Sequence, residues 1–104
     1  MPHATAKIGD TIIAEADKWE SVEGNVYFPR SSLKNSAGTF DLIQSDASTF
    51  CPWKGTASYY DIAVKETGTI ISDAAWYYAE PYEAAKNIGG HVAFYKGKVD
   101  VAVE

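Results

Sequence analysis

The side chains best suited to chemistry lie close together in one stretch of the chain, residues 49–60. This stretch reads Thr-Phe-Cys-Pro-Trp-Lys-Gly-Thr-Ala-Ser-Tyr-Tyr and contains the only cysteine, Cys51. A thiol can act as a nucleophile, a lysine can anchor an anion, and aromatic rings can stack on a flat ligand. Because large rings are costly to leave in water, we expect this stretch to be covered by other elements or to bind a ligand.

Cys51 is the candidate for enzymatic chemistry. A neighbouring cation such as Lys54 favours the reactive thiolate form of a cysteine. Thiol catalysis usually also needs a base, and the chain offers only two histidines, His3 near the N-terminus and His91 on an expected strand. Since no third partner is evident, a buried structural thiol is the favoured interpretation, and thiol or redox catalysis by Cys51 is the alternative.

Aromatic side chains in two separate segments form the second group of candidates. Trp53 and Tyr59 belong to the first stretch, and Trp76 and Tyr78 belong to residues 73–78. Such rings can wall a pocket for a planar or cationic ligand, and a pocket of this kind needs a few polar groups. We expect a ligand-binding site formed by Trp53, Lys54, Tyr59, Asp73 and Trp76.

Each of these residues also has a purely structural explanation. The rings can simply fill the core of a small sheet protein, and Lys54 can be a solvated turn residue. Asp73 can pair with Lys54 or orient a ligand, but it can equally close a turn with its side chain. A tryptophan in each of two segments, each near a charge, is the feature that favours a pocket.

The composition favours one compact domain and argues against several classes of function. The chain has 104 residues, 46% of them hydrophobic, which suffices for one core. Its net charge of -5 argues against a nucleic-acid or anionic-membrane surface. One cysteine can form neither an intramolecular disulfide nor a zinc site of cysteine pairs, so we expect no metal and no cofactor. Without a signal-peptide pattern or a membrane-spanning stretch, a soluble, cytoplasmic protein is expected.

Alternation of apolar and polar residues predicts a mostly β protein, a small single domain of antiparallel strands over residues 1–104. The clearest strand is 57–64, where Tyr60, Ile62 and Val64 share one face. Turn residues then lead to 70–71 and 73–78, which suit a hairpin partner. The other expected strands are 11–15, 19–22, 26–28, 39–43, 92–94 and 99–103, with an entry segment at 1–10 and a loop at 44–49.

Turn residues also predict how these segments pair. The turn at 23–25 predicts an antiparallel meander of the three N-terminal strands, and a Lys-Gly pair predicts that the last two strands form a hairpin. A proline in a favourable first-turn position predicts one short helix over residues 81–88. Glu80 and Glu83 are explained by the favourable dipole at that helix start, without a catalytic role.

Three motifs resemble those of a known family. They are Cys-Pro-Trp-Lys-Gly-Thr-Ala-Ser-Tyr-Tyr at 51–60, Asp-Ala-Ala-Trp-Tyr-Tyr at 73–78 and Val-Ala-Phe-Tyr at 92–95, joined by Val-Glu-Gly-Asn at 22–25. Over nearly its whole length the chain is similar to the family called domain of unknown function 427. The resemblance implies a β-tent-like fold of two antiparallel sheets meeting at an angle and, by analogy of fold, a ligand site between the sheets.

Two properties associated with this family and its fold relatives are not carried over to this chain. Many proteins of this architecture bind zinc through paired cysteines, whereas Cys51 stands alone here. The family has also been filed under a nucleotidyltransferase label. The chain has no Gly-Ser start with a paired Asp-x-Asp to hold two magnesium ions, so its residues do not support that label.

The residues and the resemblance together predict a small-molecule-binding domain. The ligand would be a planar, anionic or amide-bearing metabolite held in an aromatic pocket between the sheets. Two alternatives stay open: an enzyme using Cys51, and a protein-interaction module whose exposed rings meet a partner or a second copy of the chain. The sequence leaves monomer and homodimer undecided.

Overall fold

The computed structural model describes residues 2–104, which form short strands and brief 3-10 helices. The strands are β1 (Ala4–Ile8), β2 (Thr11–Ala16), β3 (Glu20–Val22), β4 (Asn25–Pro29), β5 (Phe40–Cys51), β6 (Gly55–Val64), β7 (Thr69–Tyr77), β8 (His91–Phe94) and β9 (Asp100–Val103). The 3-10 helices are η1 (Arg30–Ser32), η2 (Asn35–Ala37) and η3 (Glu83–Ile88).

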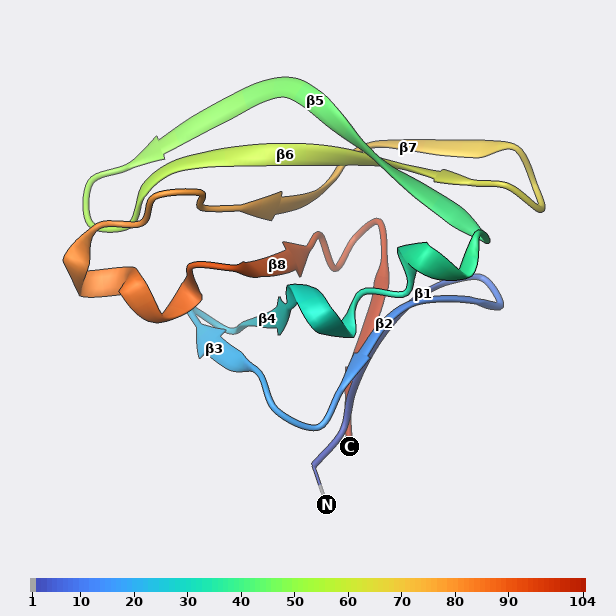
Figure 1. The fold of residues 1–104 in the computed structure, drawn as a ribbon, viewed down its shortest axis with the longest axis horizontal. Helices are drawn as coiled ribbons and strands as arrows, with labels where there is room; N and C mark the ends of the chain where they lie inside the picture. The colour runs from blue at the N-terminus through green and yellow to red at the C-terminus, as the bar shows by residue number, and fades with distance from the viewer. Residues whose placement is uncertain (1) are drawn as a thin grey trace.

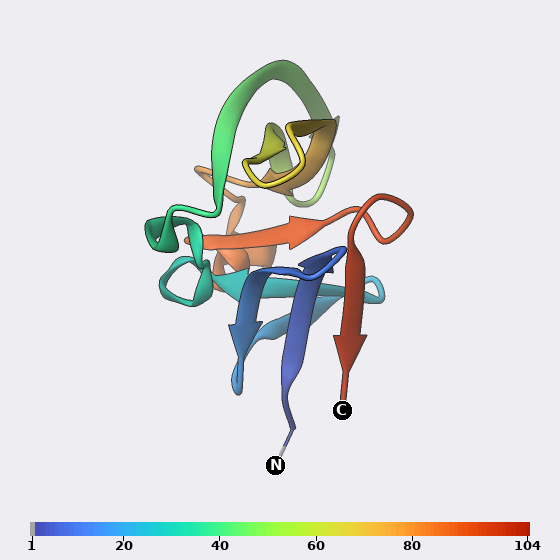
Figure 2. The same cartoon turned by 90° about the vertical axis from the view of Figure 1, so that its right-hand side faces the viewer.

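The strands form two antiparallel sheets, as the family resemblance implied. The smaller sheet has the order β2-β1-β9, and the larger has the order β3-β4-β8-β7-β6-β5. The strands of the smaller sheet run across the direction of β4 and β8, so the two sheets meet at an angle (Figures 1 and 2). This mostly β arrangement is the fold class that the resemblance implied.

The larger sheet is covered differently on its two faces, because strand residues alternate in direction. Phe28 points to the smaller sheet and packs edge-on against Phe94, with ring centroids 5.6 Å apart, in a core that contains residues of both sheets. Tyr27, the preceding residue, points to the opposite face. There it joins a second buried cluster with Ala57, Tyr78, Ala85, Ile88 and Ala93. Ala85 and Ile88 of this cluster belong to η3, which therefore covers this face of the sheet.

The hairpin predictions in the middle of the chain are confirmed. Residues 57–64 lie in β6, and β7 returns beside it with Ser58 opposite Tyr77. The predicted turn at Glu23-Gly24 connects β3 to β4, with Val22 opposite Asn25. These segments combine strong alternation with good turn residues, and both signals are local.

The predicted pairing at the two ends of the chain is wrong. Residues 1–10 contain β1, which forms a hairpin with β2, so the expected meander is reduced to β3 and β4. The last two strands do not form a hairpin either. Strand β8 is already flanked by β4 and β7, and therefore β9 crosses to the smaller sheet and pairs with β1.

Two secondary-structure predictions are also corrected. Residues 44–49, expected as a loop, belong to β5, whose polar sequence suits the outermost strand of the sheet because much of it faces solvent. The expected helix over 81–88 is the 3-10 helix η3, interrupted by non-helical dihedral angles at Ala85. Within residues 2–104, no helix is long and apolar enough to cross a membrane.

Candidate functional site

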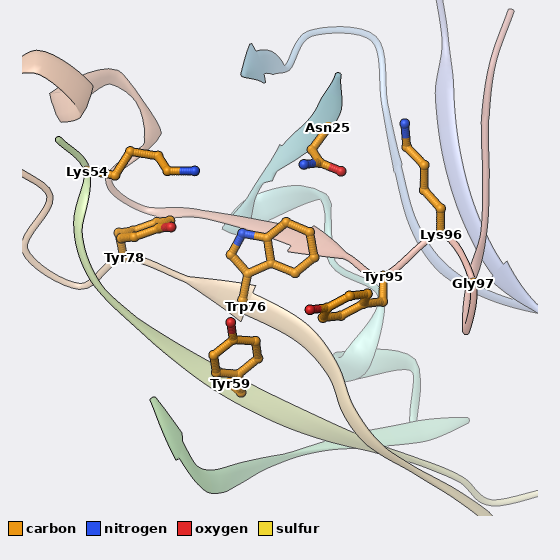
Figure 3. Close-up of a pocket in the computed structure, with 8 residues that line it drawn as sticks. All are labelled: Asn25, Lys54, Tyr59, Trp76, Tyr78, Tyr95, Lys96 and Gly97. Carbon is orange, nitrogen blue, oxygen red and sulfur yellow. The ribbon is translucent and has the colours of Figure 1, made fainter. Parts of the chain in front are cut away.

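A cleft of about 430 Å³ opens over the second face of the larger sheet. It is lined by Asn25, Lys54, Tyr59, Trp76, Tyr78, Tyr95, Lys96 and Gly97 (Figure 3). Its aromatic floor packs on the buried cluster that contains Tyr27, and that cluster includes no residue of the smaller sheet. The cleft therefore does not lie between the two sheets, where the resemblance implied a ligand site, because the main core fills that space.

Trp76 forms the centre of the cleft floor. It lies directly across from Tyr59 in the β6–β7 pair, so the two rings stand side by side on one face. Its indole N–H donates a hydrogen bond to the hydroxyl of buried Tyr27 at 3.1 Å, which fixes the ring orientation. The Tyr95 ring meets it edge-on with centroids 5.1 Å apart, and the Tyr59 hydroxyl is hydrogen-bonded to Thr49 at 2.9 Å.

Lys54 supplies a positive charge at one end of this floor (Figure 3). Only 8% of the residue is exposed, which is unusual for a lysine. Its Nζ forms an ion pair with Glu23 and lies 5.5 Å from the ring centroids of both Tyr78 and Trp53. The ammonium is thus held by one carboxylate and by aromatic faces, an arrangement suited to a buried cation.

The Lys54 ammonium is a fixed charge. Burial by itself lowers the pKa of Lys54, but the hydrogen bond that the ammonium donates to Glu23 and the phenol oxygens of Tyr27 and Tyr78 outweigh it, so the pKa lies above its ordinary value. Burial also raises the pKa of Tyr27 and of Tyr78, which keeps both phenols neutral. At neutral pH the cleft therefore offers the Lys54 ammonium and the neutral hydroxyl of Tyr78.

Gly55 explains how a lysine comes to be buried in a hairpin loop. Cys51 and Gly55 are paired across the end of β5 and β6, and the backbone at Gly55 has a φ of 111°, which side-chain-bearing residues rarely adopt. The carbonyl of Lys54 accepts a hydrogen bond from the N–H of Tyr82 at 2.9 Å. This bond ties the loop to the segment before η3 and turns the Lys54 side chain toward the cleft.

The β3–β4 turn forms the rim of the cleft above Trp76. Its two central residues, Glu23 and Gly24, have φ values of 54° and 79°, as a type I′ hairpin turn requires. Glu23 binds Lys54, and the Lys96 ammonium donates a hydrogen bond to the Gly24 carbonyl. Two lysines from different parts of the chain therefore hold one turn in place.

Comparison with known families identifies the fold unit that carries this cleft. A family model described as a domain of unknown function, DUF427, matches residues 2–104. The chain belongs to the DUF427 family. A search of curated proteins finds no match to this DUF427 domain. Every strand of both sheets and every residue of the cleft lies within the matched range.

The structure brings together three of the five residues that the sequence predicted for the site. Lys54, Tyr59 and Trp76 line the cleft of the DUF427 domain, and Tyr78, a further aromatic candidate, lines it with them. Trp53 does not line it; its ring centroid lies 5.5 Å from the Lys54 Nζ, and 40% of the residue is exposed. Tyr59 and Trp76 lie on the paired strands β6 and β7, and Lys54 lies in the loop that connects β5 to β6.

Asp73 lies outside the cleft of the DUF427 domain and does not pair with Lys54. It precedes Trp76 by three residues on β7, in the part of the strand where the β6–β7 register shifts, so regular alternation does not relate the two side chains. Its carboxylate accepts a hydrogen bond from the Ser45 hydroxyl at 2.5 Å, and its N–H donates to the Asp61 carboxylate at 2.8 Å. With a φ of 49°, Asp73 joins β5, β6 and β7 where their pairing is irregular.

Several residues of the cleft were not predicted from the sequence. Lys96 was assigned to a turn, Tyr95 was used only as the end of the motif at 92–95, and Glu23 and Asn25 were treated as turn residues. The available signal was the resemblance motif at 22–25, which places a glutamate where turn geometry prefers asparagine, aspartate or glycine. That mismatch indicates a side chain with a role beyond the turn.

Cys51 lies at the end of β5, partly buried. His3 Nδ1 is 2.7 Å from the Asp17 carboxylate, and His91 Nδ1 is 2.8 Å from the Gly89 carbonyl, so each has a different neighbour at that nitrogen. Thiol chemistry at Cys51 stays a prediction, as does the protein-interaction module. Over residues 2–104, the structure contains no group of three or more histidine, cysteine or carboxylate side chains that could hold a metal ion.

Proposed function

We propose that this DUF427 domain binds a planar small molecule in the cleft, an anionic or amide-bearing metabolite. The observation that carries the proposal is a buried lysine cation beside an aromatic floor that is open to solvent. Most lysines in a protein of this size lie at the surface. Burying a lysine is costly unless its charge is paired or contacts a ligand. Here the charge lies at the edge of a cavity.

The dimensions and lining of the cleft support a ligand of metabolite size. A volume of about 430 Å³ falls within the range typical of small-molecule sites, which combine apolar walls with a few polar groups. Trp76, Tyr59 and Tyr95 offer ring surfaces for stacking, and the Asn25 amide offers both a donor and an acceptor. Lys54 would contact the negatively charged or carbonyl-bearing end of the ligand.

A thermal-shift screen of metabolites and nucleotides tests this proposal, with two tyrosine variants as a matched pair. Tyr95 and Tyr82 are 45% and 48% exposed, and each ring packs edge-on against one aromatic neighbour, but only Tyr95 lines the cleft. A compound at one hundred times its dissociation constant stabilises a protein by about 2.7 kcal/mol. That stabilisation should disappear in Tyr95→Ala and persist in Tyr82→Ala.

Two outcomes would contradict the proposal. In one, no compound of the screen raises the melting temperature of the unmodified domain. In the other, the Tyr82→Ala variant loses the ligand response as fully as Tyr95→Ala does, which would place the binding site elsewhere. Lys54→Met is a third variant, which approximately keeps the length of the side chain but removes its charge. It should lose the stabilisation by an anionic ligand.

A further inference from the structure

We propose that Glu23 acts as an internal ligand of the cleft, and that the carboxylate of an aromatic ligand displaces it from Lys54. This inference rests on the proposed function and specifies its ligand class as planar aromatic carboxylates. The Glu23 side chain would then leave Lys54 when such a ligand binds, while the hydrogen bond from Lys96 to the Gly24 carbonyl still holds the turn.

The two members of this ion pair differ in how firmly they are held. The Lys54 side chain is 10% exposed, lies against two aromatic rings, and follows a backbone fixed by Gly55. The Glu23 side chain is 53% exposed. A half-exposed carboxylate can return to water at small cost, whereas the ammonium stays where it is. The carboxylate is thus the exchangeable partner.

Backbone conformation gives an independent reason to assign a role to Glu23. Both central positions of the turn have positive φ, and for a residue with a Cβ the left-handed conformation costs roughly 1–2 kcal/mol. Glycine, asparagine and aspartate are the residues that this turn favours. The turn geometry therefore does not explain a glutamate, but the contact with Lys54 does.

The chemistry of the displacing group follows from what Lys54 requires. Removing Glu23 without a replacement would leave a buried ammonium beside neutral rings, which is unfavourable. A neutral aromatic compound offers no replacement charge, so it should bind with Glu23 in place. A compound that presents a carboxylate beside a planar ring would satisfy Lys54 and cover Trp76 together, and the exposed Lys96 lies at the other end of the cleft (Figure 3).

The test compares two probes of the same shape, naphthoate and naphthamide, by isothermal titration calorimetry. In Glu23→Gln and Glu23→Gly, loss of the competing carboxylate should tighten naphthoate binding by about threefold to thirtyfold. Naphthamide affinity should change by less than about twofold, within ordinary surface effects. Glu23→Gly is included because glycine suits the positive φ at this position. We therefore expect this variant to be at least as stable as Glu23→Gln.

Two controls separate local displacement from general electrostatics. Glu66→Gln changes the net charge by the same amount at the distant β6–β7 turn, and it should leave both affinities unchanged. In a Lys54→Met background, Glu23→Gln should no longer affect naphthoate binding, because the pair that competes has lost its cation.

The possible results distinguish this inference from the proposed function. If both probes bind but Glu23→Gln and Glu23→Gly leave naphthoate affinity unchanged, the displacement is wrong and small-molecule binding stands. If Glu66→Gln tightens naphthoate as much as the Glu23 variants do, the effect is not local and the inference is also wrong. If neither probe binds any form, the aromatic carboxylate class is wrong, and the metabolite screen decides the proposed function separately.

Discussion

Gly55→Ala is expected to destabilise the domain by acting on the backbone that positions Lys54. Gly55 has a φ of 111° and follows Lys54 at the start of β6. A Cβ at this position would lie 3.4 Å from the Glu80 carbonyl oxygen and 3.7 Å from the Tyr82 ring. These contacts are ordinary, so the cost should come almost entirely from the backbone conformation.

Holding a residue with a side chain in such a sparsely populated region costs on the order of 1–3 kcal/mol. In a domain of this size each kcal/mol lowers the melting temperature by about 4–8 °C. Gly97→Ala is the matched control, because Gly97 lacks a positive φ and a Cβ there would meet nothing within 4 Å. That variant should stay within about 0.5 kcal/mol of the original domain.

Urea denaturation followed by tryptophan fluorescence measures the free energy of unfolding of both variants. If Gly55→Ala unfolds within about 0.5 kcal/mol of Gly97→Ala, the conformation assigned to Gly55 is wrong. If instead Gly55→Ala relaxes by shifting the loop, the stability loss will be smaller than calculated, but Lys54 will move and ligand stabilisation will fall. Stability and ligand response together therefore test whether this glycine positions the cation.

Two further predictions concern stability. The pKa values of Lys54, Tyr27 and Tyr78 lie above their ordinary values in the folded domain, so the stability they contribute is complete below about pH 10 and is lost as the pH rises through the folded values. Urea midpoints should thus be level between about pH 8 and 9.5 and fall above pH 10. A midpoint that rises above pH 10 would contradict the raised pKa values of these three groups. Phe28→Ala should cost about 3–5 kcal/mol because Phe28 is fully buried, and Phe50→Ala, at 64% exposure, less than about 1 kcal/mol. If the two variants lose the same free energy of unfolding in urea denaturation, Phe28 does not belong to the core.

The sequence predicted those features of the fold that depend on local signals. Alternation located β6, and the Glu23-Gly24 pair located a hairpin turn, because side-chain direction and positive φ are properties of a few consecutive residues. The same logic identified part of the cleft. Tyr59 and Trp76 were both candidates, and they meet because β6 and β7 are hairpin neighbours.

The features that were missed depend on contacts between distant segments. The sequence could not show that β8 has neighbours on both sides, so it paired β9 with the wrong strand. Glu23 and Lys54 are 31 residues apart, and no spacing rule joins a turn residue to a loop lysine at that distance. Asp73 was proposed as a partner of Lys54 on grounds of charge alone, but its carboxylate binds the Ser45 hydroxyl at the irregular part of the β6–β7 pairing, which no local signal indicates.

The position of β1 between β2 and β9 makes the order of synthesis important for this domain. Ala4 pairs with Val103, and the backbones of His3 and Glu104 exchange two hydrogen bonds, so the middle strand of the smaller sheet has a bare edge until residues 100–104 have left the ribosome. Within this domain, β1 therefore pairs fully only after β9 has been made. A chain interrupted shortly before residue 100 would keep that edge exposed, and an exposed edge is the kind of surface on which chains aggregate.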